Sequence, residues 1–372
     1  MEILIIGGGV IGLSLARALH KKGLQKITVL ERGLVGQESS YAAAGMLAPQ
    51  SEIDKTDEFF DFCIQSNRLY PQFAQKLFDE TDVDIELDRS GTLYLAFNQR
   101  DVDEIRRRFE WQTSAGLEVE HLTAQETRQA EPFVSPDVLE SLFFPGDWQV
   151  ENRRLLHALG KYCELYGIDV FENTEIKSLL VENDRVIGAE TENKTFRAER
   201  VVLATGAWTS LIKAGTFDLP KIKPVRGQMI SFYTAKRLFS KVIYSPRGYL
   251  VPRADGRLLA GATVEDAGFD KTVNRAGIDF VREHALEIAP SLVNLEIQDQ
   301  WAGLRPFAAD GLPVIGEFPE IANLSIATAH YRNGILLAPL TANILADRIA
   351  EGKDSDYLKF FSPVRFQAVK AV

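Results

Sequence analysis

The sequence predicts an α/β protein, α+β overall, in which a Rossmann-like nucleotide-binding domain is joined to a second domain with a mostly antiparallel sheet. Three observations support this prediction. A glycine motif separates the first apolar strand from the first helical pattern, short strands with polar turns follow in the middle of the chain, and the 372 residues exceed what one ordinary core holds. We therefore expect two domains.

The composition excludes several classes of protein. The apolar share of 45% and the charged share of 25% are typical of a soluble globular protein, and the net charge of −10 argues against non-specific nucleic-acid binding. Only Cys63 and Cys163 are present, each inside a helical pattern, so we expect no disulfide and a reducing cytoplasm. No apolar run is long enough for a membrane span, and the N-terminus lacks the basic region of a signal peptide.

The first element is predicted from the apolar run "ILII" at residues 3–6, which is typical of a buried parallel strand. Apolar residues and alanines recur at helical spacing from Val10 to Leu19, and Gly23 is expected to end that helix. A second apolar run, "ITVLE", ends in Glu31. The chain therefore opens with a strand, a helix and a second strand.

The glycines between the first strand and the helix satisfy the pattern G-x-G-x-x-G. Gly7 would permit the sharp turn, Gly9 the approach of backbone amides to a pyrophosphate, and Gly12 the close packing of helix on strand. Glu31 would accept hydrogen bonds from a ribose hydroxyl, which favours FAD or NAD over NADP. Because all these elements coincide, we interpret the motif as a dinucleotide site.

The stretch after Glu31 favours FAD over NAD. In "RGLVGQESSYAAAGMLAPQ" a long loop of small residues takes the place where an NAD-binding fold usually begins its next helix. Small residues let backbone and hydroxyl groups pack against a large flat cofactor. Farther along, residues 168–208 alternate short strands with polar turns and end in "VVLATGAW".

Four segments resemble the D-amino-acid-oxidase superfamily of FAD-dependent amine oxidases, and within it the glycine oxidases of thiamin thiazole biosynthesis. Besides the glycine motif they are "SSYAAAGML", "VVLATGAW", "GLRPFAADGLPVIG" and "HYRNGILLAP", and they occur in the family's order over nearly the whole chain. The resemblance implies a discontinuous FAD-binding domain of residues 1–80, 145–220 and 302–372. Residues 81–144 and 221–301 would form the substrate-binding domain.

Further elements follow from residue patterns. Residues 85–98 are predicted to form a hairpin around Ser90 and Gly91. Helices are predicted near residues 58–78, 101–116, 147–167 and 275–289, and residues 221–301 are otherwise rich in strands. The segment 323–352 is predicted as a strand, a glycine turn and an amphipathic helix.

The resemblance assigns residues to the substrate. An amino-acid carboxylate in an apolar pocket needs a fixed partner, and the planar fork of arginine provides one. Arg305 in "GLRP" matches the arginine that binds the carboxylate in glycine oxidases, and Arg332 in the "RNG" turn matches a second arginine at the substrate. Tyr249 matches a tyrosine that hydrogen-bonds the carboxylate, and Met46 matches the pocket methionine.

Two positions depart from the family pattern. Arg247 stands where glycine oxidases commonly have histidine, and Val264 follows "GAT" where methionine is frequent. Arg247, which we include among the candidate substrate residues, either adds positive charge at the entrance or points to solvent. The choice among glycine, sarcosine and small D-amino acids therefore stays open, as do oxidase and dehydrogenase activity.

Implied cofactor contacts are spread over the glycine motif, the small-residue loop and the late turn. They are Gly7, Gly9, Val10, Ile11, Gly12, Glu31, Arg32, Ser39, Ser40, Ala44, Gly45, Met46, Ile176, Gly206, His330, Tyr331, Arg332, Asn333, Gly334, Ile335 and Leu336. His330 would pack beside the cofactor or offer a backbone contact, and a helix beginning near Ile335 would direct its dipole at the flavin. Covalent attachment in related enzymes uses a late cysteine, which this chain lacks, so FAD is expected to be non-covalent.

The implied chemistry is hydride transfer from the substrate α-carbon to flavin N5, giving an imine that hydrolyses to glyoxylate or another 2-oxo acid plus ammonia. Oxygen would reoxidise the flavin and form hydrogen peroxide. Such a reaction requires no dedicated acid–base residue and no metal. The resemblance further implies a homotetramer and a hand-off of the product to a thiazole synthase, with no nucleic-acid or membrane partner.

Overall fold

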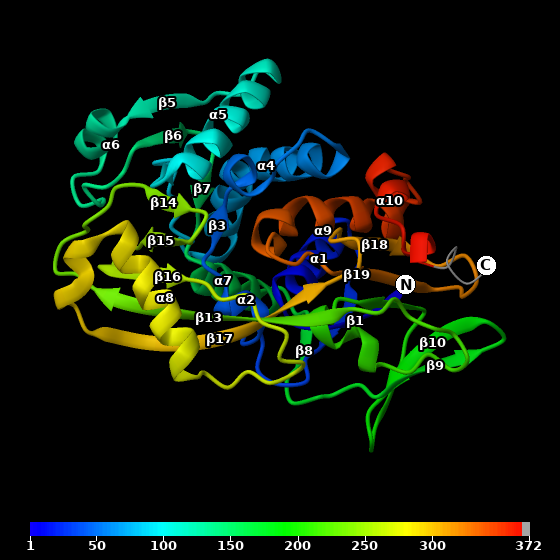
Figure 1. The fold of residues 1–372 in the computed structure, drawn as a ribbon. Coiled ribbons are helices and arrows are strands. Elements are labelled where there is room, and N and C mark those ends of the chain that lie inside the picture. The colour runs from blue at the N-terminus through cyan, green and yellow to red at the C-terminus, as the bar shows by residue number, and fades with distance from the viewer. Residues whose placement is uncertain (367–372) are drawn as a thin grey trace.

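The computed structural model describes residues 1–366, and most of its strands belong to two large sheets (Figure 1). The first sheet has six strands in the order β18-β19-β12-β1-β2-β8. Its strands are β1 (Glu2–Ile6), β2 (Lys26–Leu30), β8 (Asp169–Phe171), β12 (Arg200–Leu203), β18 (Val314–Glu317) and β19 (Leu324–Thr328). All neighbours pair in parallel except β18 and β19, which confirms the Rossmann-like prediction.

The second sheet has eight strands in the order β17-β13-β16-β15-β14-β4-β6-β5. They are β4 (Thr92–Ala96), β5 (Glu120–Thr123), β6 (Glu140–Phe144), β13 (Lys223–Tyr233), β14 (Val242–Ser245), β15 (Gly248–Pro252), β16 (Arg257–Gly261) and β17 (Ile297–Phe307). Only β14 and β4 pair in parallel, so the predicted antiparallel sheet is confirmed.

Three helices pack against the first sheet, and a fourth helix, α4 (Glu58–Thr81), packs on two of them. The three are α1 (Val10–Lys21), α7 (Asn152–Leu165) and α9 (Gly334–Glu351). Helix α1 packs between α7 and α9, and α4 lies across both. The opposite face of the sheet is covered by a meander of β9 (Ser178–Glu182), β10 (Arg185–Glu190) and β11 (Thr195–Arg197). Because both faces of the sheet are covered, β1 can be apolar and buried from Ile3 to Ile6.

Helix α8 (Arg275–Ile288) packs on β13, β15 and β16, and α5 (Gln99–Ser114) packs on β4 and β6. Short elements complete the chain. They are α2 (Ser39–Ala42), β3 (Met46–Leu47), α3 (Pro49–Glu52), α6 (Ala124–Ala130), β7 (Trp148–Gln149), α10 (Asp356–Phe360) and the 3-10 helices η1 (Gly206–Leu211), η2 (Pro290–Asn294) and η3 (Pro363–Phe366). None of the helices in residues 1–366 has the length and apolar character that a bilayer crossing would need.

The predicted hairpin at residues 85–98 is wrong. Strand β4 pairs with β6 and β14, whereas the residues before Ser90 contribute only a bridge from Asp88 to Gln149. Asp88 accepts hydrogen bonds from the backbone and the hydroxyl of Ser90, at 2.9 and 2.6 Å. This turn, which a sequence pattern does not distinguish from a hairpin, redirects the chain into the sheet.

The strands follow the predicted domain division closely. Those of the six-stranded sheet lie within residues 1–80, 145–220 and 302–366, and those of the eight-stranded sheet within 81–144 and 221–307. Strand β17 runs past the predicted boundary at residue 301 and continues to Phe307. The boundaries themselves stay a prediction, and the last part of it, 367–372, lies outside the described residues.

Candidate functional site

The glycine turn after β1 requires glycine for steric reasons. Gly7 has a φ of +112°, and a Cβ there would lie 2.3 Å from the carbonyl oxygen of Ala204 on the neighbouring chain segment. A Cβ on Gly12 would lie 1.9 Å from the carbonyl oxygen of Gly7. These contacts confirm the expected close packing of α1 on β1. As a result, the N-terminus of α1 opens directly at the end of the strand.

Glu31 is held in place by backbone amides at the end of β2. The amide of Gly8 donates to Oε2 at 2.8 Å and that of Gly33 donates to Oε1 at 3.0 Å. The carboxylate is buried, yet it lines the same cavity as the glycine turn. This position suits a ribose hydroxyl, as the sequence predicts.

A deep cavity, here called the first cavity, extends from the glycine turn to the start of α9. It encloses about 1120 Å³ counted to its open mouth, which suits a cofactor site. Among its walls are Gly7, Gly9, Val10, Ile11, Glu31, Arg32, Ser39, Ser40, Ile176, Gly206, His330, Tyr331, Arg332, Gly334 and Ile335. Two helix N-termini, those of α1 and α9, therefore lie at one cavity. This donor set and the glycine cradle fit a dinucleotide such as FAD.

Six predicted cofactor residues lie elsewhere. Gly12 and Leu336 do not line the cavity but pack behind its wall, while Ala44, Gly45, Met46 and Asn333 line a second cavity. Sequence reasoning missed several residues of the first cavity, among them Glu38, Thr174, Trp208 and Thr328. The guanidinium of Arg32 lies 3.9 Å from the ring centre of Trp208. Trp208 ends the segment "VVLATGAW", which carries the family resemblance, whereas nothing in the local sequence assigns the other three residues to a cofactor.

The second cavity, of about 710 Å³, shares part of its wall with the first cavity. Ser39, Ala43, Tyr331, Arg332 and Ile335 line both. The second cavity is also lined by the predicted substrate residues Met46, Tyr249 and Arg305, together with Glu52, Gly227 and Met229, which sequence reasoning missed. Four of the five predicted substrate residues thus meet at one place, next to the proposed cofactor cavity.

Arg305 extends across β13 into the second cavity. Its Nη1 donates to the carbonyl oxygen of Thr263 at 3.1 Å. A Cβ on Gly227 would lie 2.3 Å from that same nitrogen, so glycine at this position makes room for the guanidinium. In residues 1–366, Arg305 forms no ion pair with a carboxylate, and its guanidinium retains donors for a carboxylate ligand.

Tyr249 lies on β15 and is buried. Its hydroxyl is 3.7 Å from the sulfur of Met229, a weak acceptor. Burial raises the pKa of Tyr249 above its ordinary value, although Arg305 and Arg332 act in the opposite direction. The phenol therefore stays protonated and can donate a hydrogen bond into the cavity.

Arg332, in contrast to Arg305, already has a protein carboxylate beside it. Its Nη2 lies 3.4 Å from Glu52 Oε1 and 3.3 Å from the hydroxyl of Tyr244. The neighbouring Glu52 raises the pKa of Arg332. The two predicted substrate arginines therefore differ, because the charge of Arg332 is partly balanced by a protein carboxylate and, within the described residues, the charge of Arg305 is not.

Arg247 does not reach either cavity. Its Nη1 lies 3.0 Å from Asp101 Oδ2 and its Nε lies 2.8 Å from Glu287 Oε2, so these two carboxylates hold the guanidinium. Neither cavity includes Arg247 among its lining residues. Val264, the other departure from the family pattern, is 62% exposed and likewise lines neither cavity. The structure thus gives no support to a substrate contact by Arg247, which stays an untested prediction.

His330 lies in the wall of the first cavity and is buried. Its Nε2 is 3.1 Å from the hydroxyl of Thr341 on α9, and burial lowers the pKa of His330 to about 3. The imidazole is therefore neutral near pH 7 and suited to packing rather than proton transfer. Within residues 1–366 no cluster of three His, Cys, Asp or Glu side chains could hold a metal.

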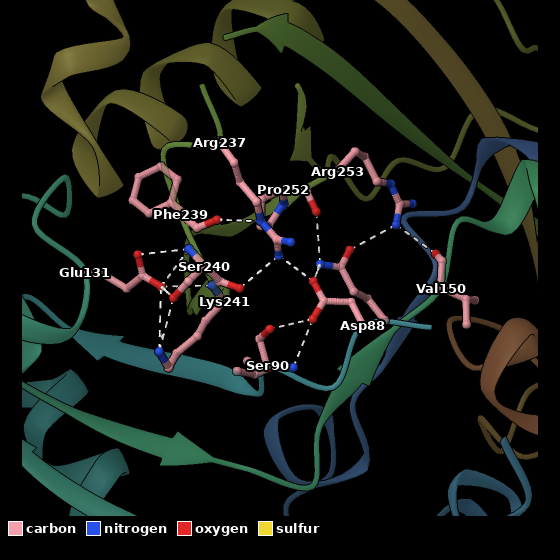
Figure 2. A network of polar contacts seen from close by, with 12 residues as sticks. Asp88, Ser90, Glu131, Val150, Arg237, Phe239, Ser240, Lys241, Pro252 and Arg253 are labelled. Atoms are coloured by element: carbon pink, nitrogen blue, oxygen red, sulfur yellow. Dashed lines mark hydrogen bonds and ion pairs between the residues drawn. The ribbon is translucent and has the colours of Figure 1, made fainter. Parts of the chain in front are cut away.

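A buried arginine fixes the segment that carries Met46. Figure 2 shows Arg253 directed at Val150, with Asp88 and Arg237 on the other side of the network. Arg253 donates to the carbonyl oxygens of Val150 at 2.7 Å and Ala44 at 2.8 Å. Burial lowers the pKa of Arg253 to about 10. Because Ala44 lines the second cavity, this network joins the eight-stranded sheet to the cavity wall.

Comparison with known proteins agrees with this geometry. The model of a family described as FAD dependent oxidoreductase matches residues 2–348. A glycine oxidase from Bacillus subtilis is 33% identical over 99% of this chain and 98% of its own length. The bifunctional protein ThiO/ThiG from Trichormus variabilis is 35% identical over 98% of this chain and 55% of its own length.

Among solved structures, glycine oxidase from Geobacillus kaustophilus has a TM-score of 0.91 and 33% identity, with 97% of each chain covered. The sequence motifs, the fold and the cavity walls lead to the same family. This chain belongs to the FAD-dependent oxidoreductases of the D-amino-acid-oxidase type.

Proposed function

We propose that this protein is an FAD-dependent oxidase of glycine and other small amino acids. The observation that carries the proposal is the meeting of Arg305, Tyr249 and Met46 in a cavity that shares a wall with the proposed FAD cavity. A guanidinium and a neutral phenol provide donors for a carboxylate, and the surrounding walls are formed largely by small or apolar residues.

Within this proposal Arg305 binds the carboxylate and Tyr249 donates a hydrogen bond to one of its oxygens. These two contacts orient the α-carbon towards the shared wall. Bound FAD supplies the acceptor for the hydride that leaves the carbon next to the nitrogen. Burial lowers the pKa of His330, which makes the imidazole a weak base, and His330 does not line the second cavity, so we assign it no proton transfer.

The N-terminus of α9 contributes electrostatically. Gly334 lines the first cavity and is the first residue of an 18-residue helix. The positive end of such a helix stabilises negative charge on a group bound in front of it. Gly334 itself has room for a Cβ, since the nearest atom would be 3.7 Å away in His330, so the protein alone does not require glycine there.

Several finer points belong to the same proposal. Oxygen is the electron acceptor and hydrogen peroxide the reduced product. FAD is dissociable, because Cys63 and Cys163 are buried in α4 and α7 and line neither cavity. A homotetramer and a cytoplasmic location are proposed from the family resemblance alone. A hand-off of the imine to a thiazole synthase is proposed from the same resemblance and is supported by relatives named bifunctional protein ThiO/ThiG.

The deciding experiment is anaerobic mixing of the purified yellow protein with glycine, sarcosine and D-alanine. We expect the absorbance of oxidised flavin to fall fastest with glycine. Fastest bleaching by sarcosine or D-alanine would instead indicate an N-methyl amino acid oxidase or a D-amino-acid oxidase. Bleaching that air does not reverse, with turnover restored by an artificial acceptor, would indicate a dehydrogenase, and a colourless preparation would contradict the proposal.

A further inference from the structure

The second cavity contains an acidic side chain that the proposed reaction does not use. Its charged residues are Arg305, Arg332 and Glu52. The Glu52 side chain is only 8% exposed, whereas that of Arg332 is 34% exposed. A carboxylate in a pocket that must bind another carboxylate needs an explanation, because like charges repel.

The two arginines differ in how their charge is balanced. Arg332 is paired with Glu52 and also contacts the hydroxyl of Tyr244. Arg305 contacts the neutral carbonyl of Thr263 and has no carboxylate partner among residues 1–366. The three charges sum to +1, which matches one carboxylate of an incoming ligand but not two.

Glu52 is held by the backbone on both sides of it. Asp147, which is fully buried, accepts hydrogen bonds from the amides of Gln50 at 2.9 Å and Ser51 at 2.8 Å. Arg108 donates to the carbonyl oxygen of Ile53 at 2.7 Å. These contacts fix the short helix α3, so the carboxylate of Glu52 is set against Arg332 by a rigid support.

We propose that Glu52 is a specificity-determining residue, which occupies Arg332 and so restricts the pocket to amino acids with a single carboxylate. This inference rests on the proposed function and adds its substrate class. A ligand with a second carboxylate would have to displace Glu52 from Arg332 and would meet its negative charge. Glu52 thus acts by repulsion: it disfavours ligands with two carboxylates and adds no contact to ligands with one.

The test uses non-oxidisable ligands on the holoenzyme, so that binding is measured separately from turnover. Glycolate carries one carboxylate and malonate carries two. Dissociation constants are measured by calorimetry and by the change in the flavin spectrum. We expect the wild-type protein to bind glycolate more tightly than malonate. In Glu52→Gln we expect malonate affinity to rise about tenfold relative to glycolate, because Arg332 becomes available.

Two controls accompany this variant. Glu58→Gln removes the same charge from an exposed position at the start of α4, and we expect the glycolate-to-malonate ratio of the wild type. The double variant Glu52→Gln with Arg332→Gln restores the net charge of +1, and we expect the gain in malonate affinity to disappear. A gain that persists in the double variant would contradict the assignment to Arg332.

The outcomes separate this inference from the proposed function. If the wild-type holoenzyme binds malonate as tightly as glycolate, this result alone contradicts the proposed role of Glu52, and no variant is needed. An unchanged ligand ratio in folded, flavin-containing Glu52→Gln would also overturn it, even though glycine still bleached the flavin. If glycine leaves the flavin oxidised and glycolate does not bind, the proposed function itself fails.

Discussion

The two cavities are built by different means. The first cavity is formed largely by the chain turning at motifs, with Gly7 and Gly9 after β1 and Gly334 at the start of α9. In the second cavity, side chains meet from segments that are far apart in sequence, such as Glu52, Tyr249 and Arg305. A site formed by backbone turns can therefore be predicted from short sequence motifs. A site formed by side chains from distant segments depends on how the two sheets pack together, which no short motif predicts.

Because the two cavities are built differently, substitutions in them should impair different properties of the protein. A side chain added in the turn after β1 meets backbone atoms, which cannot move without disturbing the strand. A side chain added in the second cavity at Gly227 meets the end of Arg305, which can rotate away. Substitutions in the turn after β1 should therefore impair folding and cofactor retention, and a substitution at Gly227 should impair ligand binding.

Gly12→Ala should have the largest effect. Its Cβ would lie 1.9 Å from the carbonyl oxygen of Gly7, so α1 must shift from β1. We expect purification without bound flavin and a loss of about 3 kcal/mol or more in the free energy of unfolding. The ratio of flavin to protein absorbance and urea unfolding measure both effects.

Gly160→Ala is the matched control for this variant. Gly160 lies within α7, and an added Cβ would have no atom within 4 Å. Alanine favours a helix interior over glycine by about 1 kcal/mol, so the control should keep its flavin and be at least as stable as the wild type. Equal behaviour of the two variants would refute the steric account of the glycine turn.

Arg305→Leu should have the second largest effect, and the affected property is substrate binding. Removing one partner of a partly buried charge pair costs ligand affinity strongly, and we expect kcat/KM for glycine to fall about 100- to 1000-fold. The flavin spectrum should persist, because Arg305 does not line the first cavity. Stopped-flow reduction under anaerobic conditions gives the substrate affinity. An unchanged affinity in the flavin-containing variant would show that another group binds the carboxylate.

Gly227→Ala should have a smaller effect of the same kind. The added Cβ would lie 2.3 Å from Nη1 of Arg305, and the flexible guanidinium would move rather than the strand. We expect KM for glycine to rise about tenfold, with the cost in unfolding free energy below about 1 kcal/mol. A large loss of stability with unchanged KM would contradict the role of Gly227 in placing Arg305.

The sequence was most informative where local chemistry decides the structure. The turn at Gly7 is predicted and confirmed, Glu31 follows directly after the end of β2, and α9 begins at Gly334, one residue before the predicted start near Ile335. The resemblance also predicted Arg305 and Tyr249, which do line the second cavity. Their meeting could not be derived from spacing, because they lie on different strands of the eight-stranded sheet.

The sequence predictions are less accurate where contacts between distant parts of the chain determine the structure. The hairpin at residues 85–98 was wrong because Thr92 pairs with Phe144 and Val242, both distant in the chain. Glu52 was missed, since an acidic residue after "APQS" has no local feature that assigns it to Arg332. The motif position predicts Arg247 at the substrate, but Asp101 and Glu287 hold its side chain.

His330, in the wall of the first cavity, provides the smallest expected effect near neutral pH and tests whether that wall holds charge. Burial lowers the pKa of His330 to about 3 from an ordinary value of 6.5. Between these values the unfolded chain binds the proton and the folded protein does not, so stability rises with pH. The contribution is complete above pH 6.5 and is lost, at up to about 1.4 kcal/mol per pH unit, as the pH falls towards 3.

The variant His330→Gln keeps a polar partner for Thr341 but cannot titrate, and it should remove this part of the pH dependence. Urea unfolding of the holoenzyme at pH 6.5, 5.5 and 4.5 measures the slope, with the wild type losing about 2 kcal/mol more than the variant over that range. His157→Gln is the control, because that side chain is exposed on α7 and should leave the slope unchanged. A wild-type slope equal to that of His330→Gln would mean that the folded protein accepts a proton at His330, and proton transfer at the wall of the first cavity would then have to be reconsidered.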